Sequence, residues 1–363
     1  MRHMAPPSEP FVLPRTGIEV ANRCLLAAMT NKQSHEDGSL SDEEIHWLTM
    51  RAKGGFGIVT TAAANVTETG RGWDGEMGVW GDHQLPGLTK MAEGLRAHGA
   101  LSLVQIFHGG MRAPQSINGV QPVSASVNTE AGMDGSTRAL SSLEVEDMVE
   151  AFADAAVRCE QAGFDGVELH GAHSYLICQF LGTETNRRQD EWGGSYEARK
   201  RFLWAIIEAV RARTSPNFLV FVRISPLIEK MGIHLEESLQ LAQDLVKADV
   251  DGLHISCWDV FQEVNDADDR LMIKRFADAL PDDFPLISTG GVWSAKDAQF
   301  VMDEGAHFVG VGRVAIGHSD WARHIGDVDY DPQRAPFTAE HLSKEGLSPV
   351  FIDYMRRWKN FVV

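Results

Sequence analysis

Apolar residues fall into eight short runs separated by longer amphipathic stretches. The runs have the length of buried strands, and they cover 24–28, 58–61, 101–107, 165–169, 218–224, 252–255, 284–287 and 307–311. The stretches between them space apolar residues as one face of a helix does, over 41–52, 86–98, 143–162, 197–213, 235–248, 268–280, 295–303 and 319–325. Eight alternations of strand and helix predict an α/β fold, a single (β/α)8 TIM barrel.

Signals at the helix ends support this division of the chain. Ser41 followed by Glu44 is typical of a capping box, which satisfies exposed amides in the first turn of a helix. Ser142, before an acidic first turn, indicates the start of the helix that precedes the fourth strand. Gly163 follows that helix and suits the left-handed conformation that often ends one.

The chain is longer than a bare barrel requires. A barrel takes about 250 residues and the chain has 363, so we expect one elaborated domain over 1–363. An insertion over about 114–142, after the third strand, is predicted to cap the barrel mouth. We expect a second insertion, over 181–195, to be an ordered loop held by charge pairs, with a merely solvated loop as the alternative. A C-terminal tail covers about 326–363.

Composition and charge narrow the class of protein. The chain is 44% hydrophobic, and no apolar run approaches the ~20 residues of a membrane span, so we expect no membrane partner. A formal net charge of −18 argues against nucleic acid as a partner, since that requires clustered Lys and Arg. Four cysteines stand far apart without a CxxC spacing, which favours reduced thiols and a cytoplasmic location.

The segment 166–175 carries the first candidate chemistry. Its apolar residues lead into His170, His173 and Tyr175, so three proton-handling side chains lie at the carboxyl end of a strand, where barrels build active sites. From the residues alone, the histidines are also candidate metal ligands, although two ligands rarely hold zinc. A further alternative is a pair of ordinary loop histidines beside an exposed tyrosine.

Two glycine-bearing loops indicate a phosphate site. Gly290 and Gly291 follow the seventh strand, and Gly312 and Arg313 follow the eighth, so we expect the loops side by side on one face. Glycine lets backbone N–H groups approach phosphate oxygens, and an arginine can chelate them. Each pair alone is more simply a tight turn, but their joint placement favours phosphate binding.

The chain resembles the old yellow enzymes, the FMN-containing ene-reductases, from about residue 11 to 325. The resemblance rests on motifs at 22–30, 105–110, 162–168 with His170, His173 and Tyr175, 179–181, 186–187, Asp190, 193–195, Arg199, 223–226, 290–291 and 312–313. It implies FMN as the cofactor and NADPH or NADH as the reductant. Because the paired glycine loops provide for one phosphate, we expect FMN rather than FAD.

The resemblance also implies which residues hold the flavin. Arg223, at the end of the fifth strand, would place its positive charge beside the part of the ring that becomes negative on reduction. Gln105 would bond to the pyrimidine edge, and Thr30 would donate its hydroxyl to the flavin O4. The expected cofactor contacts are Ala28, Met29, Thr30, Ala62, Gln105, Arg223, Gly290, Gly291, Gly312 and Arg313.

For the chemistry, the resemblance implies reduction of activated C=C bonds in α,β-unsaturated carbonyl or nitro compounds. His170 and His173 would donate to the substrate oxygen, hydride would pass from flavin N5 to the β-carbon, and Tyr175 would protonate the α-carbon. The expected substrate contacts are His170, His173, Tyr175, Phe107, Trp258 and Phe261. For the last two, aromatic core packing is an equally good interpretation.

Three positions depart from the family pattern. Ala28 stands where many members have Pro, which should matter little. Met111 stands where Arg is usual, which removes a cation near the cofactor and leaves Arg112 as a displaced substitute. Ser174 stands where Gly commonly separates the histidine from the tyrosine, and serine tolerates a left-handed backbone poorly.

Two other functions fit the same residues. One is an FMN-dependent dehydrogenase, desaturase or amine oxidoreductase, which would use the same flavin cradle in the oxidative direction. The other is a non-redox phosphate-binding barrel. The partners expected are a small-molecule enone or nitro substrate and a second copy of the chain, which would dock through residues 354–358 as in some relatives to give a homodimer; no metal is expected.

Overall fold

Eight parallel strands form a closed barrel in a computed structural model, which describes residues 5–129, 135–265 and 268–363. The strands pair in sequence order, and the barrel closes where the last strand pairs with the first, with Val309 beside Cys24. They are β3 (Cys24–Leu26), β4 (Ile58–Asn65), β5 (Leu101–Phe107), β8 (Gly166–Gly171), β9 (Leu219–Ile224), β10 (Gly252–Ser256), β13 (Leu286–Thr289) and β14 (Phe308–Val311). The predicted TIM barrel and all eight predicted strands are confirmed.

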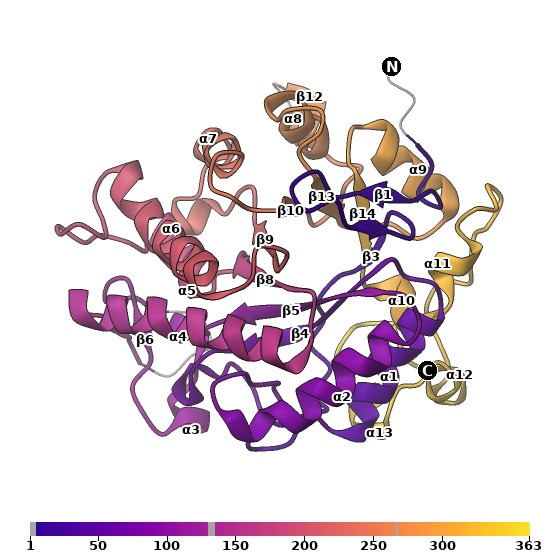
Figure 1. The fold of residues 1–363 in the computed structure, drawn as a ribbon, viewed down its shortest axis with the longest axis horizontal. Helices are drawn as coiled ribbons and strands as arrows, with labels where there is room; N and C mark the ends of the chain where they lie inside the picture. The colour runs from indigo at the N-terminus through magenta and orange to yellow at the C-terminus, as the bar shows by residue number, and fades with distance from the viewer. Residues whose placement is uncertain (1–4, 130–134, 266–267) are drawn as a thin grey trace.

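Helices surround the barrel (Figure 1). They are α1 (Asp42–Lys53), α2 (Leu85–Arg96), α4 (Ser142–Ala162), α5 (Leu176–Leu181), α6 (Tyr196–Arg213), α7 (Leu235–Leu245), α8 (Met272–Ala279), α9 (Ala295–Asp303), α10 (Arg313–Gly317) and α11 (Trp321–His324). Their apolar faces pack against outward-facing strand residues such as Val104, Val167 and Val220. Among the helices of the described ranges, none has the length and apolar character needed to cross a membrane.

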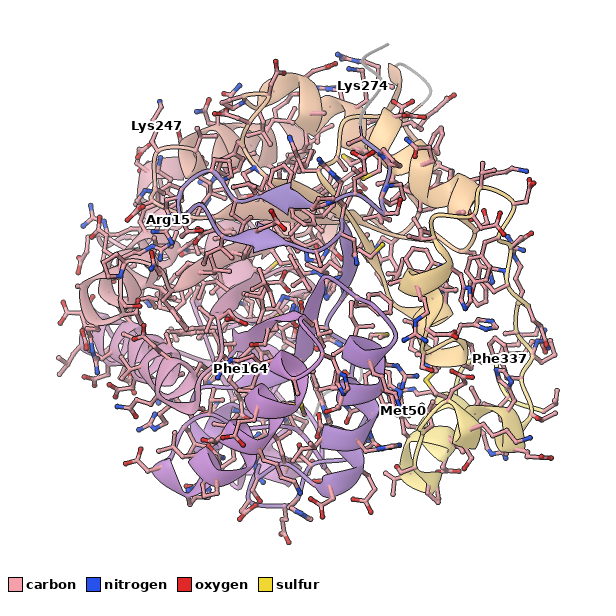
Figure 2. All side chains as sticks on the ribbon, turned by 45° about the vertical axis from the view of Figure 1, so that its right-hand side comes forward. Arg15, Met50, Phe164, Lys247, Lys274 and Phe337 are labelled. Carbon is pink, nitrogen blue, oxygen red and sulfur yellow. The ribbon has the colours of Figure 1, made fainter. Side chains whose placement is uncertain are left out.

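An N-terminal hairpin closes the end of the barrel where the strands begin. Its strands, β1 (Phe11–Val12) and β2 (Glu19–Val20), are antiparallel, and Leu13 between them packs into the apolar core inside the barrel. Arg15, in the turn of the hairpin (Figure 2), donates at 2.8 Å to Asp251, just before β10. The carboxyl ends of the strands therefore remain as the place for a site.

The structure corrects the helix predicted over 268–280. Its first four residues form β12 (Asp268–Leu271), which pairs with β11 (Glu263–Asn265), and α8 begins only at Met272. The neighbouring strand satisfies backbone groups that a helix would have paired internally. No Gly or Pro separates strand from helix, so the sequence carries no boundary signal at this point.

Two helix starts also differ in detail from the prediction. Ser41 caps α1 and accepts a hydrogen bond from the Glu44 amide at 3.1 Å, but the Glu44 carboxylate accepts from the preceding loop, so the capping box is wrong. The cap of α4 is Ser141 and not Ser142, and there a full capping box does form. Gly163 ends α4 with a φ of 92°, as predicted.

The two predicted insertions pack on each other. The first contains α3 (Gln115–Asn118), β6 (Val123–Ser124) and β7 (Arg138–Ala139). Its residues 130–134 lie outside the described part of the chain. The second is held by an Arg188–Asp190 ion pair at 2.6 Å, which confirms the predicted charge pairing. Asn128 joins the two by donating to the Thr185 carbonyl at 2.8 Å.

A buried arginine ties the C-terminal tail to the barrel. The tail contains α12 (Ala339–Lys344) and α13 (Pro349–Met355). Arg51, in α1, is fully buried and donates to the carbonyl oxygens of Ala315 at 2.9 Å and Glu345 at 2.6 Å. The guanidinium therefore joins the first barrel helix to α10 and to the tail.

Candidate active site

Successive side chains of a strand point alternately outward and inward, and several inward-facing side chains of neighbouring strands are polar. In β8, Val167 and Leu169 face the helices, so the residues between and after them face inward. The polar side chains that this alternation places inside the barrel are Gln105, Glu168, His170, Arg223 and His254. All of them are buried, and buried polar groups require partners or a ligand.

The structure brings the three predicted catalytic side chains together. The rings of His170 and His173 have centroids 5.0 Å apart at an angle of 90°. The ring of Tyr175 lies 5.0 Å from that of His170. His170 lies near the end of β8 and Tyr175 directly precedes α5, so the strand-to-helix turn holds the cluster at the carboxyl end of the barrel.

This turn has a left-handed backbone at two residues that are not glycine. His173 has a φ of 56° and Ser174 a φ of 65°, a conformation that costs L-residues about 1–2 kcal/mol each. The His173 amide donates to Ser225 Oγ at 3.0 Å, and the Ser174 carbonyl accepts from Gln179 at 2.7 Å. These bonds hold the turn. Position 174 therefore does adopt the left-handed backbone conformation that serine tolerates poorly.

Both site histidines are neutral in the folded protein. Burial is the main reason that the pKa of each lies well below its ordinary value, and the nearby Arg223 charge lowers the pKa further. His173 Nε2 lies 2.7 Å from Ser256 Oγ, which accepts from Arg223 at 3.0 Å. His170 Nδ1 is buried without a hydrogen-bond partner in the described residues, so it is available to a ligand.

Tyr175 is fixed by contacts to its ring. Phe107 meets it edge to face with centroids 4.8 Å apart, and Trp73 stacks behind Phe107 at 5.7 Å. The Arg112 guanidinium carbon lies 4.8 Å from the centre of the Tyr175 ring. Burial raises the pKa of the Tyr175 phenol to about 12, although the Arg112 charge opposes this. The phenol is therefore protonated at neutral pH.

Arg112, and not residue 111, supplies the cation at this edge of the site. Met111 is buried in a small cluster with Cys178 and Met231. Arg112 donates to the His173 carbonyl at 2.7 Å. The arginine that the resemblance leads us to expect at position 111 is thus replaced by a charge one residue later, which contacts the turn that carries His173.

A chain of hydrogen bonds crosses the barrel interior beside this cluster. Gln105 Nε2 donates to Glu168 Oε1 at 2.6 Å, and His254 Nδ1 lies 2.7 Å from Glu168 Oε2. His254 Nε2 lies 2.6 Å from Thr289 Oγ1. Sequence reasoning gave no role to Glu168 or His254, although the inward phase of their strands was a signal that could have found them.

The glycine loops after β13 and β14 lie side by side because these two strands pair. Gly291 has a φ of 76°, and a Cβ on Gly290 would lie 2.4 Å from the Cys257 carbonyl oxygen. Gly312 directly precedes α10. Arg313 is exposed and forms no ion pair within the described residues. The loops have the open backbone and the free cation that a phosphate group requires.

The loop after β3 reaches the same end of the barrel. The predicted contacts here are Ala28, Met29, Thr30 and, in β4, the buried Ala62. Glu44 fixes the loop by accepting from Asn31 at 2.8 Å, which explains why Glu44 does not complete the capping box of α1. A Cβ on Gly312 would lie 3.2 Å from Met29 Sδ, so the loop adjoins the predicted phosphate site.

The remaining predicted pocket residues lie on the β10–α8 connection. Trp258 is 90% exposed. Phe261 packs against Phe300 of α9 with ring centroids 5.2 Å apart, close to Gly291. Among the described side chains, no ring contact joins either residue to Phe107. Their place in a pocket wall stays a prediction.

The residues present fit a flavin mononucleotide. Arg223 is buried with its Nε unpartnered among the described residues, as expected of a cation that awaits an acceptor. The paired glycine loops fit one phosphate. Across the described ranges, no group of three or more His, Cys, Asp or Glu side chains is placed to hold a metal ion.

Comparison with known sequences decides the family. The family model described as "NADH:flavin oxidoreductase / NADH oxidase family" matches residues 9–330. The chain belongs to this family. The resemblance to the old yellow enzymes is confirmed, and this family member is an oxidoreductase that uses FMN with NADH or NADPH as the reductant.

The relatives of this family member differ in size. It is 38% identical over 320 residues to the "Probable NADH-dependent flavin oxidoreductase YqiG" of Bacillus subtilis (strain 168), covering 86% of each chain. It is 36% identical to the "NADH:fumarate oxidoreductase" of Klebsiella pneumoniae (strain 342), where the match covers 87% of this chain but 35% of that protein. The solved old yellow enzyme homologue from Zymomonas mobilis superposes with a TM-score of 0.81 at 25% identity, covering 95% of this chain and 99% of that chain.

Proposed function

We propose that this enzyme reduces activated C=C bonds of α,β-unsaturated carbonyl or nitro compounds. The observation that carries the proposal is the cluster of His170, His173 and Tyr175, in which two neutral imidazoles and a protonated phenol lie with ring centroids 5.0 Å apart in each adjacent pair. Bound FMN supplies the two-electron chemistry, as an acceptor of hydride from NADH or NADPH and a donor of hydride to the alkene.

His170 and His173 would bind the substrate oxygen. N–H donors aimed at a carbonyl or nitro oxygen draw electrons away from the conjugated double bond, which makes the β-carbon electrophilic. His170 offers a buried ring nitrogen without a protein partner in the described residues. His173 is held in place through Ser256, 2.7 Å from its Nε2, so the pair is oriented before substrate arrives.

Tyr175 would protonate the α-carbon. The β-carbon receives hydride and the α-carbon receives the phenolic proton, so the alkene gains two hydrogens and two electrons, and solvent returns a proton to Tyr175. A phenol whose pKa is raised to about 12 stays protonated at neutral pH and yields its proton to a strong base such as an enolate carbon. The Arg112 charge beside the ring stabilises the phenolate that forms.

An anaerobic assay in deuterated water tests this proposal. Purified holoenzyme is mixed with NADH or NADPH and with 2-cyclohexenone or a nitroalkene, and the product is analysed by mass spectrometry and NMR. We expect nicotinamide consumption that depends on the alkene, with deuterium at the α-carbon only. Nicotinamide oxidation that no alkene accelerates would rule out the proposed function.

A second candidate function is oxidation of NADH with delivery of electrons to an acceptor other than an alkene. The observation in its favour is the description of the matching family model, "NADH:flavin oxidoreductase / NADH oxidase family", which names NADH oxidation and no alkene acceptor. The same assay, repeated with ferricyanide under anaerobic conditions and with dioxygen in air-saturated buffer, separates the two candidates. Rapid NADH oxidation with ferricyanide or dioxygen, unaffected by every alkene, would favour this second function.

We also propose that the enzyme acts in the cytoplasm as a homodimer joined through its C-terminal residues 354–358. Trp358 and Val350 are exposed large apolar side chains of the tail, which supports the dimer. All four cysteines are free thiols, which supports the cytoplasmic location. Light scattering after size-exclusion chromatography should give twice the mass of one chain. A Trp358→Glu variant should elute as a monomer, while the surface change Val328→Glu should leave the dimer intact.

A further inference from the structure

A buried carboxylate lies at the centre of the polar network inside the barrel. Glu168 has no exposed surface, and both of its oxygens have partners: Gln105 at 2.6 Å and His254 at 2.7 Å. These partners come from β5 and β10, which lie on either side of the β8–β9 pair. Glu168 therefore links strands across the barrel, at the level just below His170.

Glu168 carries a negative charge in the folded protein. Burial alone would raise the pKa of its carboxyl group, but His254, Arg223 and the Gln105 amide together hold that pKa below its ordinary value. His254 stays neutral because burial lowers the pKa of its imidazole. Neutral His254 donates through Nδ1 to Glu168 and accepts through Nε2 from the Thr289 hydroxyl at 2.6 Å. The donor and the acceptor of each hydrogen bond in this network are then fixed.

The charge of Glu168 fixes the orientation of the Gln105 side-chain amide. A carboxylate only accepts hydrogen bonds, so the amide nitrogen and not the amide oxygen must face it. Gln105 Oε1 accepts no hydrogen bond within the described part of the chain. The amide therefore offers its oxygen and its second N–H to a ligand, in an arrangement set before the ligand binds.

Thr289 extends the same network to the phosphate loops. It is the last residue of β13 and directly precedes Gly290. A Cβ on Gly310 would lie 1.8 Å from Thr289 Oγ1, so only glycine at position 310 leaves room for the hydroxyl that bonds to His254. One hydrogen-bonded chain thus runs from Gln105 to the residue before the paired glycines.

Glu168 and Arg223 place opposite charges in the same interior. Both side chains are buried and face inward from the paired strands β8 and β9, where Arg223 lies opposite His170, two residues beyond Glu168. Reduced flavin carries a negative charge, so a cation stabilises it and an anion opposes it. The two side chains therefore act on the reduction of a bound flavin with opposite sign.

We propose that Glu168 is a positioning residue of the flavin site, which fixes the amide of Gln105 for the flavin pyrimidine and offsets the charge of Arg223 to set the flavin reduction potential. The inference rests on FMN as the cofactor and not on the alkene substrate. Failure of the alkene assay above would therefore leave it standing.

The reduction potential of the FMN-loaded Glu168→Gln variant tests this role. Removal of the negative charge should favour binding of reduced over oxidised FMN by at least about tenfold, which is a shift of about 30 mV to more positive potential for a two-electron couple. Dye-equilibrated anaerobic titration measures the potential, and flavin fluorescence measures the dissociation constant. An unchanged potential together with unchanged FMN affinity would overturn the inference.

Asp165→Asn is the matched control. Asp165 directly precedes β8, so it lies at the amino end of the strand that carries Glu168. Its carboxylate joins this end to β5 by accepting from the Ser102 amide at 2.7 Å and the Ser102 hydroxyl at 2.8 Å. Loss of this carboxylate should lower stability without a change in potential. Equal potential shifts in Asp165→Asn and Glu168→Gln would show a general effect of charge and would refute a specific role for Glu168.

A measurement on the wild-type protein covers the case in which Glu168→Gln does not fold. In protein labelled with 15N-glutamine, the side-chain NH2 signals of Gln105 are assigned by their loss in Gln105→Met. They should be protected from solvent exchange both before and after FMN is added, because Glu168 holds the amide nitrogen in either state. Protection that arises only with FMN would mean that the ligand orients Gln105, against the proposed role.

Discussion

The ring of Tyr175 meets the ring of Phe107 edge to face, with centroids 4.8 Å apart and planes at 75°. Neither this contact nor the Arg112 guanidinium 4.8 Å from the Tyr175 centroid involves the phenolic oxygen. Tyr175→Phe should therefore keep the ring in place and remove only the proton donor. Flavin reduction by NADPH or NADH should stay within a few-fold of wild type, whereas reoxidation by an enone should slow by roughly 10²-fold or more.

Rapid-mixing kinetics on each half-reaction measure these effects, and a nitroalkene provides the control. Its nitronate product is stable enough to leave without the Tyr175 proton, so transfer to the nitroalkene should survive the substitution far better. Equal slowing of both half-reactions, or no slowing with the enone, would assign Tyr175 to the pocket wall alone.

Replacing His170 and His173 together with Ala should weaken the binding of phenols and enones and leave FMN bound. The two imidazoles are the neutral donors of the cluster, and loss of a hydrogen bond to an anionic or polarised oxygen costs about 1.5–3 kcal/mol, or tenfold and more in affinity. Titration with a para-substituted phenol, followed by its long-wavelength absorption with oxidised flavin, measures this. His98→Ala, at an exposed position, is the control, and an undiminished band in the double variant would contradict the assignment.

Arg223→Met should lower the reduction potential of bound FMN and weaken its retention. The guanidinium is buried with an unpartnered Nε in the described residues, and its charge stabilises the reduced flavin. The same titration that tests Glu168→Gln measures this change, and the two shifts should have opposite signs. A flavin-loaded Arg223→Met protein with an unaltered potential would remove Arg223 from the flavin site.

Ser174→Gly should raise the free energy of unfolding by between zero and about 1 kcal/mol. Glycine removes the steric cost of the φ of 65° at this position, and its greater freedom in the unfolded chain offsets part of that gain. Ser174→Ala retains the unfavourable backbone and should gain nothing. Urea unfolding of both variants decides, and a glycine variant clearly less stable than the alanine variant would show that the turn is not strained.

Stability should depend on pH through His108. Burial lowers the pKa of this imidazole to about 4, below its value in the unfolded chain, so the unfolded state binds a proton more readily below pH 6.5. The stabilisation is complete above pH 6.5 and is lost as pH falls toward 4, by about 2 kcal/mol between pH 6.5 and 5. His108→Asn can still accept from the Gly110 amide, which lies 2.9 Å from His108 Nδ1, and should lose this dependence relative to wild type in urea unfolding.

The barrel was predictable from the sequence because each strand is a short, mainly apolar run bounded by polar or glycine residues. The helix over 268–280 was wrong at its start because a paired strand and a helix can follow each other without a breaking residue. Helix α5 (Leu176–Leu181) was missed since its six residues are too few to show a helical period.

The proximity of His170, His173 and Tyr175 was predictable because they lie within six residues at a strand end. The Glu168 network was not, because its members are 35 to 86 positions apart in the chain and only the closed barrel brings them together. Single polar residues within apolar strands are the one local sign of such networks, and their partners follow only from the pairing of the strands.

Arg51 bears on how the chain acquires its fold during synthesis. Its guanidinium is buried by contacts with carbonyl groups of Ala315 and Glu345, which a ribosome adds more than 260 residues after it. Strand β3 likewise gains its second neighbour only when β14 appears. A nascent chain halted before residue 345 would leave this cation without its last acceptor, so the first barrel helix should reach its native packing only after residue 345 has left the ribosome.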